Sequence, residues 1–219
     1  IVGIGPGGRS SSFGTVTFLV RMPKSCWPPR TLTTRRVQGF AVQHYIHNMG
    51  VLKAFALGAA QHAATDSAFM AYANGMGEEL THPNMCRALA YSQGMSQEEF
   101  DGTVPVFGAL AHTAVCIHGM YLATLVEMRA NALSNETMVQ RYATEFNEYL
   151  SKAPYNLSLE AREFFTVHMG ADIEHTERAA NSIAELAQSE EDQEKVRAMC
   201  RNMAKLKLGK FDSIYDEYA

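Results

Sequence analysis

Apolar side chains recur every three or four residues along the chain after Thr31, which is the spacing of amphipathic helices. A first helix is expected to be capped by Thr33 or Thr34. Ser96 followed by Glu99 is the signature of a capping box, which predicts a short helix before Pro105. The helices expected in the first half of the chain therefore cover Thr33–Met49, Val51–Ala73, a segment ending at Ser92 and a short segment after Ser96, with breaks near Gly75 and Gly77.

The second half of the chain has the same periodicity and few helix-breaking residues. Val106–Leu150 is almost free of breakers, and its largely apolar part Ala109–Ala132 is typical of a central buried helix. A bend is expected around Ser134 and Asn135. Two further helices are expected, one capped by Ser158 and running to about Ala187, the other starting at Ser189 and running to about Tyr215. No alternating strand pattern longer than four residues occurs after residue 20, so the sequence predicts an all-α bundle of about seven helices.

Residues 1–30 differ from the helical domain expected over residues 31–219. Five of the first fourteen residues are glycine, and residues 1–30 also contain four of the seven prolines and the only tryptophan. Gly3, Gly5 and Gly8 match the spacing of a dinucleotide-binding loop. A serine-rich stretch follows instead of a helix, however, and no acidic residue occurs before Asp66, so a nucleotide site is not supported. We expect an irregular arm or extension.

Charge and cysteine content narrow the function classes. The formal net charge is −4, with seven basic and no acidic residues in positions 1–65 against 12 basic and 23 acidic residues afterwards. An acidic helical domain argues against nucleic-acid binding. The sequence contains no run of about 18 apolar residues, so no membrane-spanning helix is expected. Cys26, Cys86, Cys116 and Cys200 are widely spaced without a CxxC pair, as expected of reduced thiols in a cytoplasmic protein, with Cys116 buried.

His168, Asp172 and His175 stand at i, i+4 and i+7 on one expected helix. At 100° per residue these offsets fall within about 60° of one another, on a single stripe. Two imidazoles and a carboxylate on one stripe can form half of a metal site in a helical bundle. The alternative is a solvated polar face.

Partners for this stripe exist elsewhere in the chain. Glu79 and His82 have the Glu-x-x-His spacing of di-iron carboxylate bundles. Glu136 lies inside the breaker-free region, where an unpaired buried carboxylate would be costly. Alternatively, Ser134 could cap an exposed helix start with Glu136 in its first turn. Three histidines and three carboxylates suit two irons, or one iron with a labile second position.

The chain resembles a known family through three elements. These are His168-x-x-x-Asp172-x-x-His175 after a Phe-Phe pair, the Glu-Glu…His-Pro element at 78–83, and the segment from Leu32 to Tyr45. Over residues 31–215 it is similar to the haem-oxygenase-like (TenA/PqqC-type) superfamily, and within it to the haem-oxygenase-like di-iron oxidases around the chlamydial death-domain-associating protein. The resemblance implies a haem-oxygenase-like bundle, Fe(II), most simply two ions, and O2 as co-substrate.

The resemblance also implies residue roles. The implied metal ligands are Glu79, His82, Glu136, His168, Asp172 and His175, with Glu78 as the alternative to Glu79. A small organic substrate is expected in a cavity between the helices. Its expected lining is Phe40, His44, Tyr45, Met120 and Leu122. Because dimers are common in this fold, the resemblance also implies a homodimer.

Other functions remain open on the sequence alone. A TenA-like thiaminase, or aminopyrimidine hydrolase, would use Cys116 as its nucleophile. Haem could bind through His44 or His47 on the first helix. A cofactor-free oxidase like PqqC lacks its Arg/Tyr/His-rich pocket here, and a non-enzymatic helical interaction protein would not need the six ligand candidates.

Overall fold

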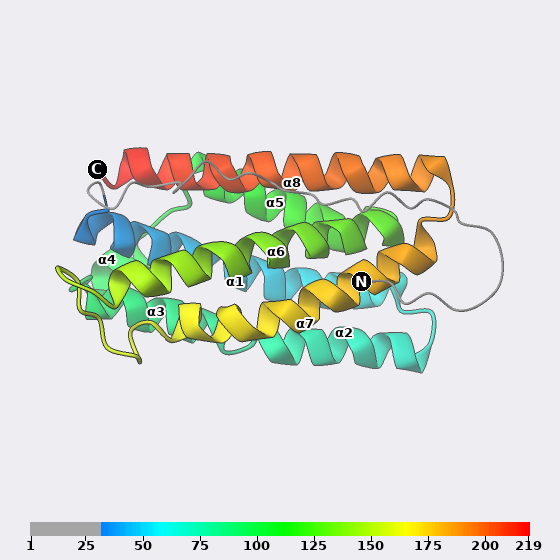
Figure 1. The fold of residues 1–219 in the computed structure, drawn as a ribbon. Coiled ribbons are helices and arrows are strands. Elements are labelled where there is room, and N and C mark those ends of the chain that lie inside the picture. The colour runs from blue at the N-terminus through cyan, green and yellow to red at the C-terminus, as the bar shows by residue number, and fades with distance from the viewer. Residues whose placement is uncertain (1–31) are drawn as a thin grey trace.

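The computed structural model describes residues 32–219, apart from the side chains of residues 67–68 and 171–172. The arm and the glycine motif expected over residues 1–30 lie outside this range. The described residues form eight helices and no strand, which confirms the all-α prediction (Figure 1). The helices are α1 (Thr34–His62), α2 (Asp66–Glu79), α3 (His82–Ser92), α4 (Gln97–Asp101), α5 (Phe107–Tyr121), α6 (Leu125–Leu150), α7 (Glu163–Leu186) and α8 (Glu190–Glu217).

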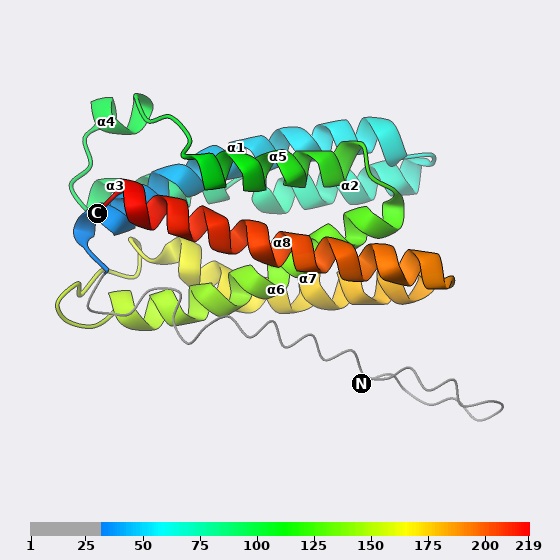
Figure 2. The ribbon, with the colours of Figure 1, turned by 90° about the horizontal axis from the view of Figure 1, so that it is seen from above.

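The long helices pack side by side in one elongated bundle. Helix α1 contacts α2, α3 and α5, while α6 and α7 form a second packed pair. Helix α8 contacts both α5 and α6 and so joins the two groups (Figure 2). None of the described helices combines the length and apolar character that crossing a membrane requires.

The expected break between Met49 and Val51 is wrong. Helix α1 continues through Gly50 as far as His62. The glycine is there for packing: a Cβ at Gly50 would lie 2.6 Å from the Thr113 methyl group on α5. Helix α2 likewise continues through Gly75 and Gly77, so the breaks expected there are also wrong.

The long segment expected over 106–150 is interrupted, but not at Ser134. Helix α5 ends at Tyr121, and Thr124 then starts α6 with a capping box in which Glu127 closes back on the Thr124 N–H. Ser134 lies in the middle of the unbroken helix α6, so the bend expected there is wrong. Helix α7 begins at Glu163 rather than directly after Ser158, and it follows turns in which Ser158 Oγ accepts the Ala161 N–H at 3.2 Å.

Three expected helix starts are confirmed. Thr33 accepts the Arg36 N–H, the capping box after Ser96 forms, and Ser189 accepts the Asp192 N–H at 3.1 Å. The main core is centred on Phe40, whose ring lies 5.6–6.1 Å from several other aromatic rings. Those rings are Phe165, Phe164 and Phe211. Cys116 is buried, as expected, and so are Cys86 and Cys200.

Candidate metal centre

The turn between α2 and α3 brings the first two ligand candidates together. Glu79 is the last residue of α2, and His82 is the first of α3, where Pro83 supports the helix start. His82 Nδ1 lies 2.5 Å from Glu79 Oε2, and both side chains are largely buried. The expected Glu-x-x-His pair is therefore formed across a two-residue turn.

His168 on α7 faces this pair. Its ring centroid lies 4.3 Å from that of His82. His168 Nδ1 lies 2.6 Å from the Phe164 carbonyl oxygen. Because a carbonyl can only accept, Nδ1 carries the proton and Nε2 keeps its lone pair. Burial, together with the nearby His82, lowers the pKa of His168 to about 4, so the ring is neutral at pH 7. A neutral imidazole oriented by a backbone carbonyl is the usual form of a metal-binding histidine.

His175 lies two turns further along α7, between two carboxylates. Its Nε2 is 3.3 Å from Glu78 Oε2, and its Nδ1 is 3.6 Å from Glu136 Oε2 on α6. The hydrogen bond with Glu136 raises the pKa of His175. Glu78 is more exposed and also binds Arg178 at 3.2 Å. The alternative in which Ser134 caps an exposed helix start at Glu136 is wrong, because α6 is continuous there and Glu136 faces the bundle interior.

Asp172 lies on α7, one turn after His168, but its side chain is outside the described set. The other five predicted ligands and Glu78 come from four helices and meet in one region. Their role as metal ligands stays a prediction.

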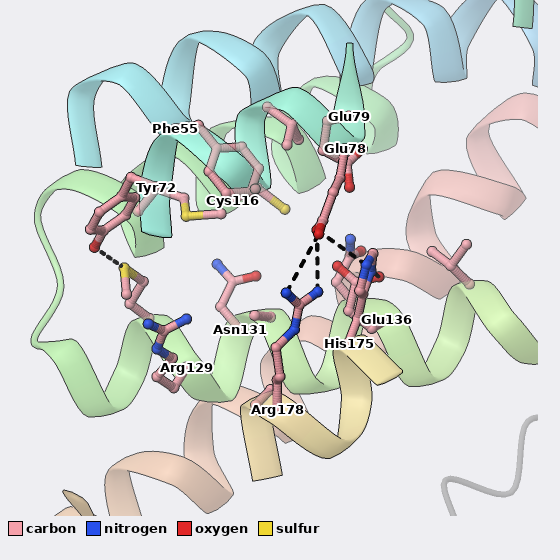
Figure 3. Close-up of a pocket in the computed structure, with 18 of the residues that line it drawn as sticks. Phe55, Tyr72, Glu78, Glu79, Cys116, Arg129, Asn131, Glu136, His175 and Arg178 are labelled. Carbon is pink, nitrogen blue, oxygen red and sulfur yellow. Dashed lines mark hydrogen bonds and ion pairs between the residues drawn. The ribbon is translucent and has the colours of Figure 1, made fainter. Parts of the chain in front are cut away.

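A cavity of about 270 Å³ adjoins this cluster, between α1, α2, α5, α6 and α7. Carboxylates and imidazoles of the cluster line one part of it. Apolar side chains and two arginines line the rest (Figure 3). These other lining residues include Phe55, Tyr72, Met128, Arg129 and Arg178.

Comparison with known proteins identifies the family. A model of the family described as "Iron-containing redox enzyme" matches residues 38–208. The chain belongs to this family. Membership implies iron binding, and no functionally curated protein matches the sequence.

Solved structures share the fold of this family member. A domain of unknown function with a haem-oxygenase-like fold from Shewanella denitrificans OS217 is similar at a TM-score of 0.75 and 19% identity, over 85% of this chain and 80% of that one. A TenA homologue from Pseudomonas syringae pv. tomato is similar at 0.71 and 13% identity, over 84% and 81%. A TenA homologue from P. horikoshii is similar at 0.70 and 15% identity, over 86% of both chains. At these identities the likeness establishes the haem-oxygenase-like fold alone.

The donor set of this family member fits iron. Neutral imidazole and carboxylate together are ligands typical of non-haem iron. His168 offers a free Nε2, and the carboxylates of Glu79 and Glu136 lie beside the imidazoles of His82 and His175. Such a set leaves room for two ions or for one.

Only some of the residues that were expected to line the cavity do so. His44 and Met120 do, whereas Phe40, Tyr45 and Leu122 do not. The Phe40 ring is buried in the aromatic core. Tyr45 packs on Phe100 and accepts a hydrogen bond from Arg87, and Leu122 is exposed at the α5–α6 turn.

Two cavity arginines and two buried lysines were not foreseen. Arg178 stands three residues after His175, so the stripe's spacing could have indicated it. Arg129 could not be found from sequence, because an arginine on a mixed helix is usually solvated. Lys207 and Lys210 are fully buried on α8, where Lys207 Nζ donates to Asn135, and Lys210 Nζ is hydrogen-bonded with His44 Nδ1 at 2.8 Å. Their i, i+3 spacing inside an apolar stripe was the available signal.

Proposed function

We propose that this chain is an iron-dependent, O2-activating oxidase or oxygenase with a non-haem site in the helical bundle. The observation that carries the proposal is the convergence of Glu79, His82 and His168 with Glu136 and His175 beside one cavity. The resemblance adds Asp172 to this set and favours two Fe(II) ions. Bound iron would supply the electrons that O2 reduction requires and open positions for O2.

The protein's own residues would prepare this site. The Phe164 carbonyl accepts the His168 Nδ1–H and so fixes the orientation of the imidazole, whose ring lies beside that of His82. Glu136 holds His175 in place and balances positive charge. Glu79 is the less exposed of the two adjacent glutamates and contacts His82 directly, so we retain it as the ligand. Glu78 is partly neutralised by Arg178 and suits a supporting role.

The cavity points to a small, partly apolar organic substrate with an anionic group. Its volume of about 270 Å³ lies just below the usual range of about 300–1,000 Å³ for ligand pockets. Phe55 and Met120 offer apolar contacts. Arg129 lines the cavity and has no carboxylate partner among the described residues, so its guanidinium is free to bind an anion.

The test is an anaerobic titration of metal-free protein with Fe(II), followed by exposure to O2 with oxygen consumption recorded. We expect about two Fe(II) bound per chain and rapid O2 uptake. His168→Ala should lose at least one Fe(II) and most of the uptake. His118→Ala, which removes an exposed histidine on α5, is the matched control and should behave as the wild type.

Circular dichroism would show whether both variants keep the helical bundle. The proposal fails if folded His168→Ala binds as much iron as the wild type, or if the wild type takes up iron without consuming O2.

A TenA-like hydrolase is the second candidate, since Cys116 lines the cavity and TenA homologues share the fold. Burial raises the pKa of Cys116 to about 11. Its thiol is then protonated at neutral pH and is a weak nucleophile. The structure therefore favours the iron-dependent function.

A further inference from the structure

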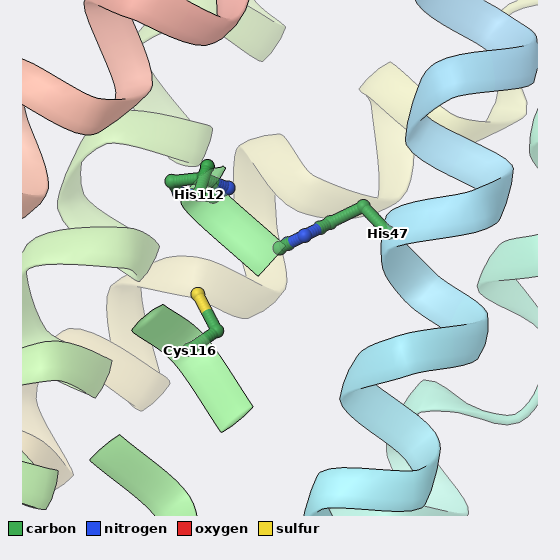
Figure 4. A group of neighbouring side chains, drawn as sticks. All are labelled: His47, His112 and Cys116. Atoms are coloured by element: carbon green, nitrogen blue, oxygen red, sulfur yellow. The ribbon is translucent and has the colours of Figure 1, made fainter. Parts of the chain in front are cut away.

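Three potential metal-binding side chains meet next to the cavity, apart from the carboxylate cluster. His112 and Cys116 stand at i, i+4 on one face of α5, and His47 reaches them from α1 (Figure 4). One donor atom from each lies within 4.8 Å of the other two. All three side chains are buried.

The buried imidazole of His112 has unsatisfied hydrogen-bonding groups among the described residues. It is 0% exposed, and neither ring nitrogen has a hydrogen-bond partner among the described residues. An unsatisfied buried polar atom typically costs about 1–3 kcal/mol, so native structures rarely keep one without a reason. A metal ion on the unprotonated nitrogen of His112 would satisfy one of the two.

His47 is held ready to act as a ligand. The Thr113 hydroxyl donates its single hydrogen to the Ala109 carbonyl at 2.8 Å, so its oxygen must accept from His47 Nδ1–H, also at 2.8 Å. Nε2 of His47 therefore keeps its lone pair. An outer hydrogen bond that fixes the tautomer in this way is typical of metal-binding histidines.

The spacing of the donors suits a transition metal after a small adjustment. Ligand bonds of about 2.0 Å to nitrogen and 2.3 Å to sulfur place such donors about 3.5–3.7 Å apart. Donors within 4.8 Å of one another need to approach by about an ångström, which side-chain rotation can supply.

The net charge of the buried complex and the softness of the thiolate favour a particular kind of ion. Lys207 and Lys210 are buried nearby, and both lysines and the carboxylate of Glu136 act electrostatically on Cys116. A divalent ion with one thiolate and two neutral imidazoles would leave a net charge of +1 at a buried site, which is costly. A monovalent ion would give a neutral complex. Thiolate also selects soft ions such as Cu(I).

We propose that His47, His112 and Cys116 form a second metal site, distinct from the iron cluster, that binds one soft monovalent ion, Cu(I), through two nitrogens and one sulfur. The Cys116 thiol loses its proton to solvent when the ion binds. His47 and Cys116 also line the cavity, so the ion would border the space assigned to the substrate.

The test is an anaerobic titration of fully reduced, metal-free protein with Cu(I) in competition with a chromophoric Cu(I) chelator. We expect one tightly bound Cu(I) per chain. X-ray absorption of the wild-type complex should show one sulfur and two nitrogen ligands. Cys116→Ser and His112→Ala should each weaken binding at least tenfold. Cys200→Ser replaces another buried free cysteine and should bind Cu(I) like the wild type.

His168→Ala separates this proposal from the iron site, because it should lose iron yet still bind Cu(I). The proposal is overturned if wild-type Cu(I) has no sulfur ligand, if folded Cys116→Ser binds as tightly as the wild type, or if His168→Ala abolishes Cu(I) binding. The spectroscopic result on the wild type decides the matter even where a variant does not fold.

Discussion

Acid should destabilise the metal-free protein through His168, which is 6% exposed and has its Nδ1 proton on the Phe164 carbonyl. Burial and the neighbouring His82 lower the pKa of His168 to about 4, against about 6.5 for a histidine in the unfolded chain. Between these values the unfolded chain binds a proton that the folded protein excludes. Stability from this residue is therefore complete above pH 6.5 and is lost as the pH falls toward 4.

The size of the effect follows from the shift. Each pKa unit corresponds to about 1.4 kcal/mol, so the full loss is about 3 kcal/mol, of which about 2 kcal/mol falls between pH 7 and pH 5. His168→Gln removes the ionisable group, while its amide can still donate to the Phe164 carbonyl. Other buried histidines, including His44, His47 and His112, have lowered pKa values and destabilise both proteins in acid alike.

The measurement is urea unfolding of both proteins at several pH values between 4.5 and 7.5, with a chelator present. The free energy of unfolding of the wild type should fall by about 2 kcal/mol more than that of His168→Gln between pH 7 and pH 5. His118→Gln, at an exposed position, controls for the loss of an imidazole. Parallel curves for wild type and His168→Gln would refute a buried neutral His168 and weaken its assignment as a preformed ligand.

Three further predictions concern other parts of the bundle. Glu136→Gln removes the main cause that raises the pKa of His175, so NMR titration of metal-free protein should show that pKa fall; an unchanged value would contradict the Glu136 contact. Gly108→Ala would place a Cβ against the Gly209 carbonyl oxygen on α8, so its free energy of unfolding in urea should be about 1–3 kcal/mol lower than that of the wild type. In Gly77→Ala, on α2, the added Cβ has no neighbour within 4 Å, so the free energy of unfolding should instead rise by about 0.5–1 kcal/mol. Equal effects of the two substitutions would refute the packing argument. Arg129→Gln should raise KM about tenfold for an anionic substrate with little change in kcat, since a charged hydrogen bond is worth about 1.5–3 kcal/mol, whereas an unchanged KM would exclude Arg129 from binding.

Most of the fold could be predicted from the apolar periodicity, because a bundle helix must bury one stripe. The helix breaks could not. Gly50 looks like a break in the sequence, yet it lies inside α1 because the Thr113 side chain leaves no room for a Cβ. The true interruption at Leu122–Thr124 depends on a capping box at Thr124 and Glu127, a local signal that an otherwise apolar segment concealed.

Part of the candidate site could also be predicted. The sequence predicts that His168 and His175 share one face, because both residues lie on one helix at offsets that bring them to the same side. The relation of this face to Glu136 needed the continuity of α6, which spacing alone left open. The pairing of His112 with His47 depends on how α1 crosses α5, and no pattern within one segment contains that information.

The two proposed metal sites differ in their donor atoms, and this difference can sort metal ions without a large difference in geometry. In the proposed iron site, carboxylates such as Glu79 and Glu136 accompany the imidazoles and would balance the charge of divalent iron. In the proposed second site, one thiol accompanies His47 and His112, so a monovalent ion would form a neutral complex at a buried position where an uncompensated charge is costly. Affinity for divalent ions rises from iron to copper at most nitrogen and sulfur sites, which makes selection by affinity alone unsafe. Net charge would supply the missing selectivity, because each proposed site would favour the ion that brings its total charge closest to zero.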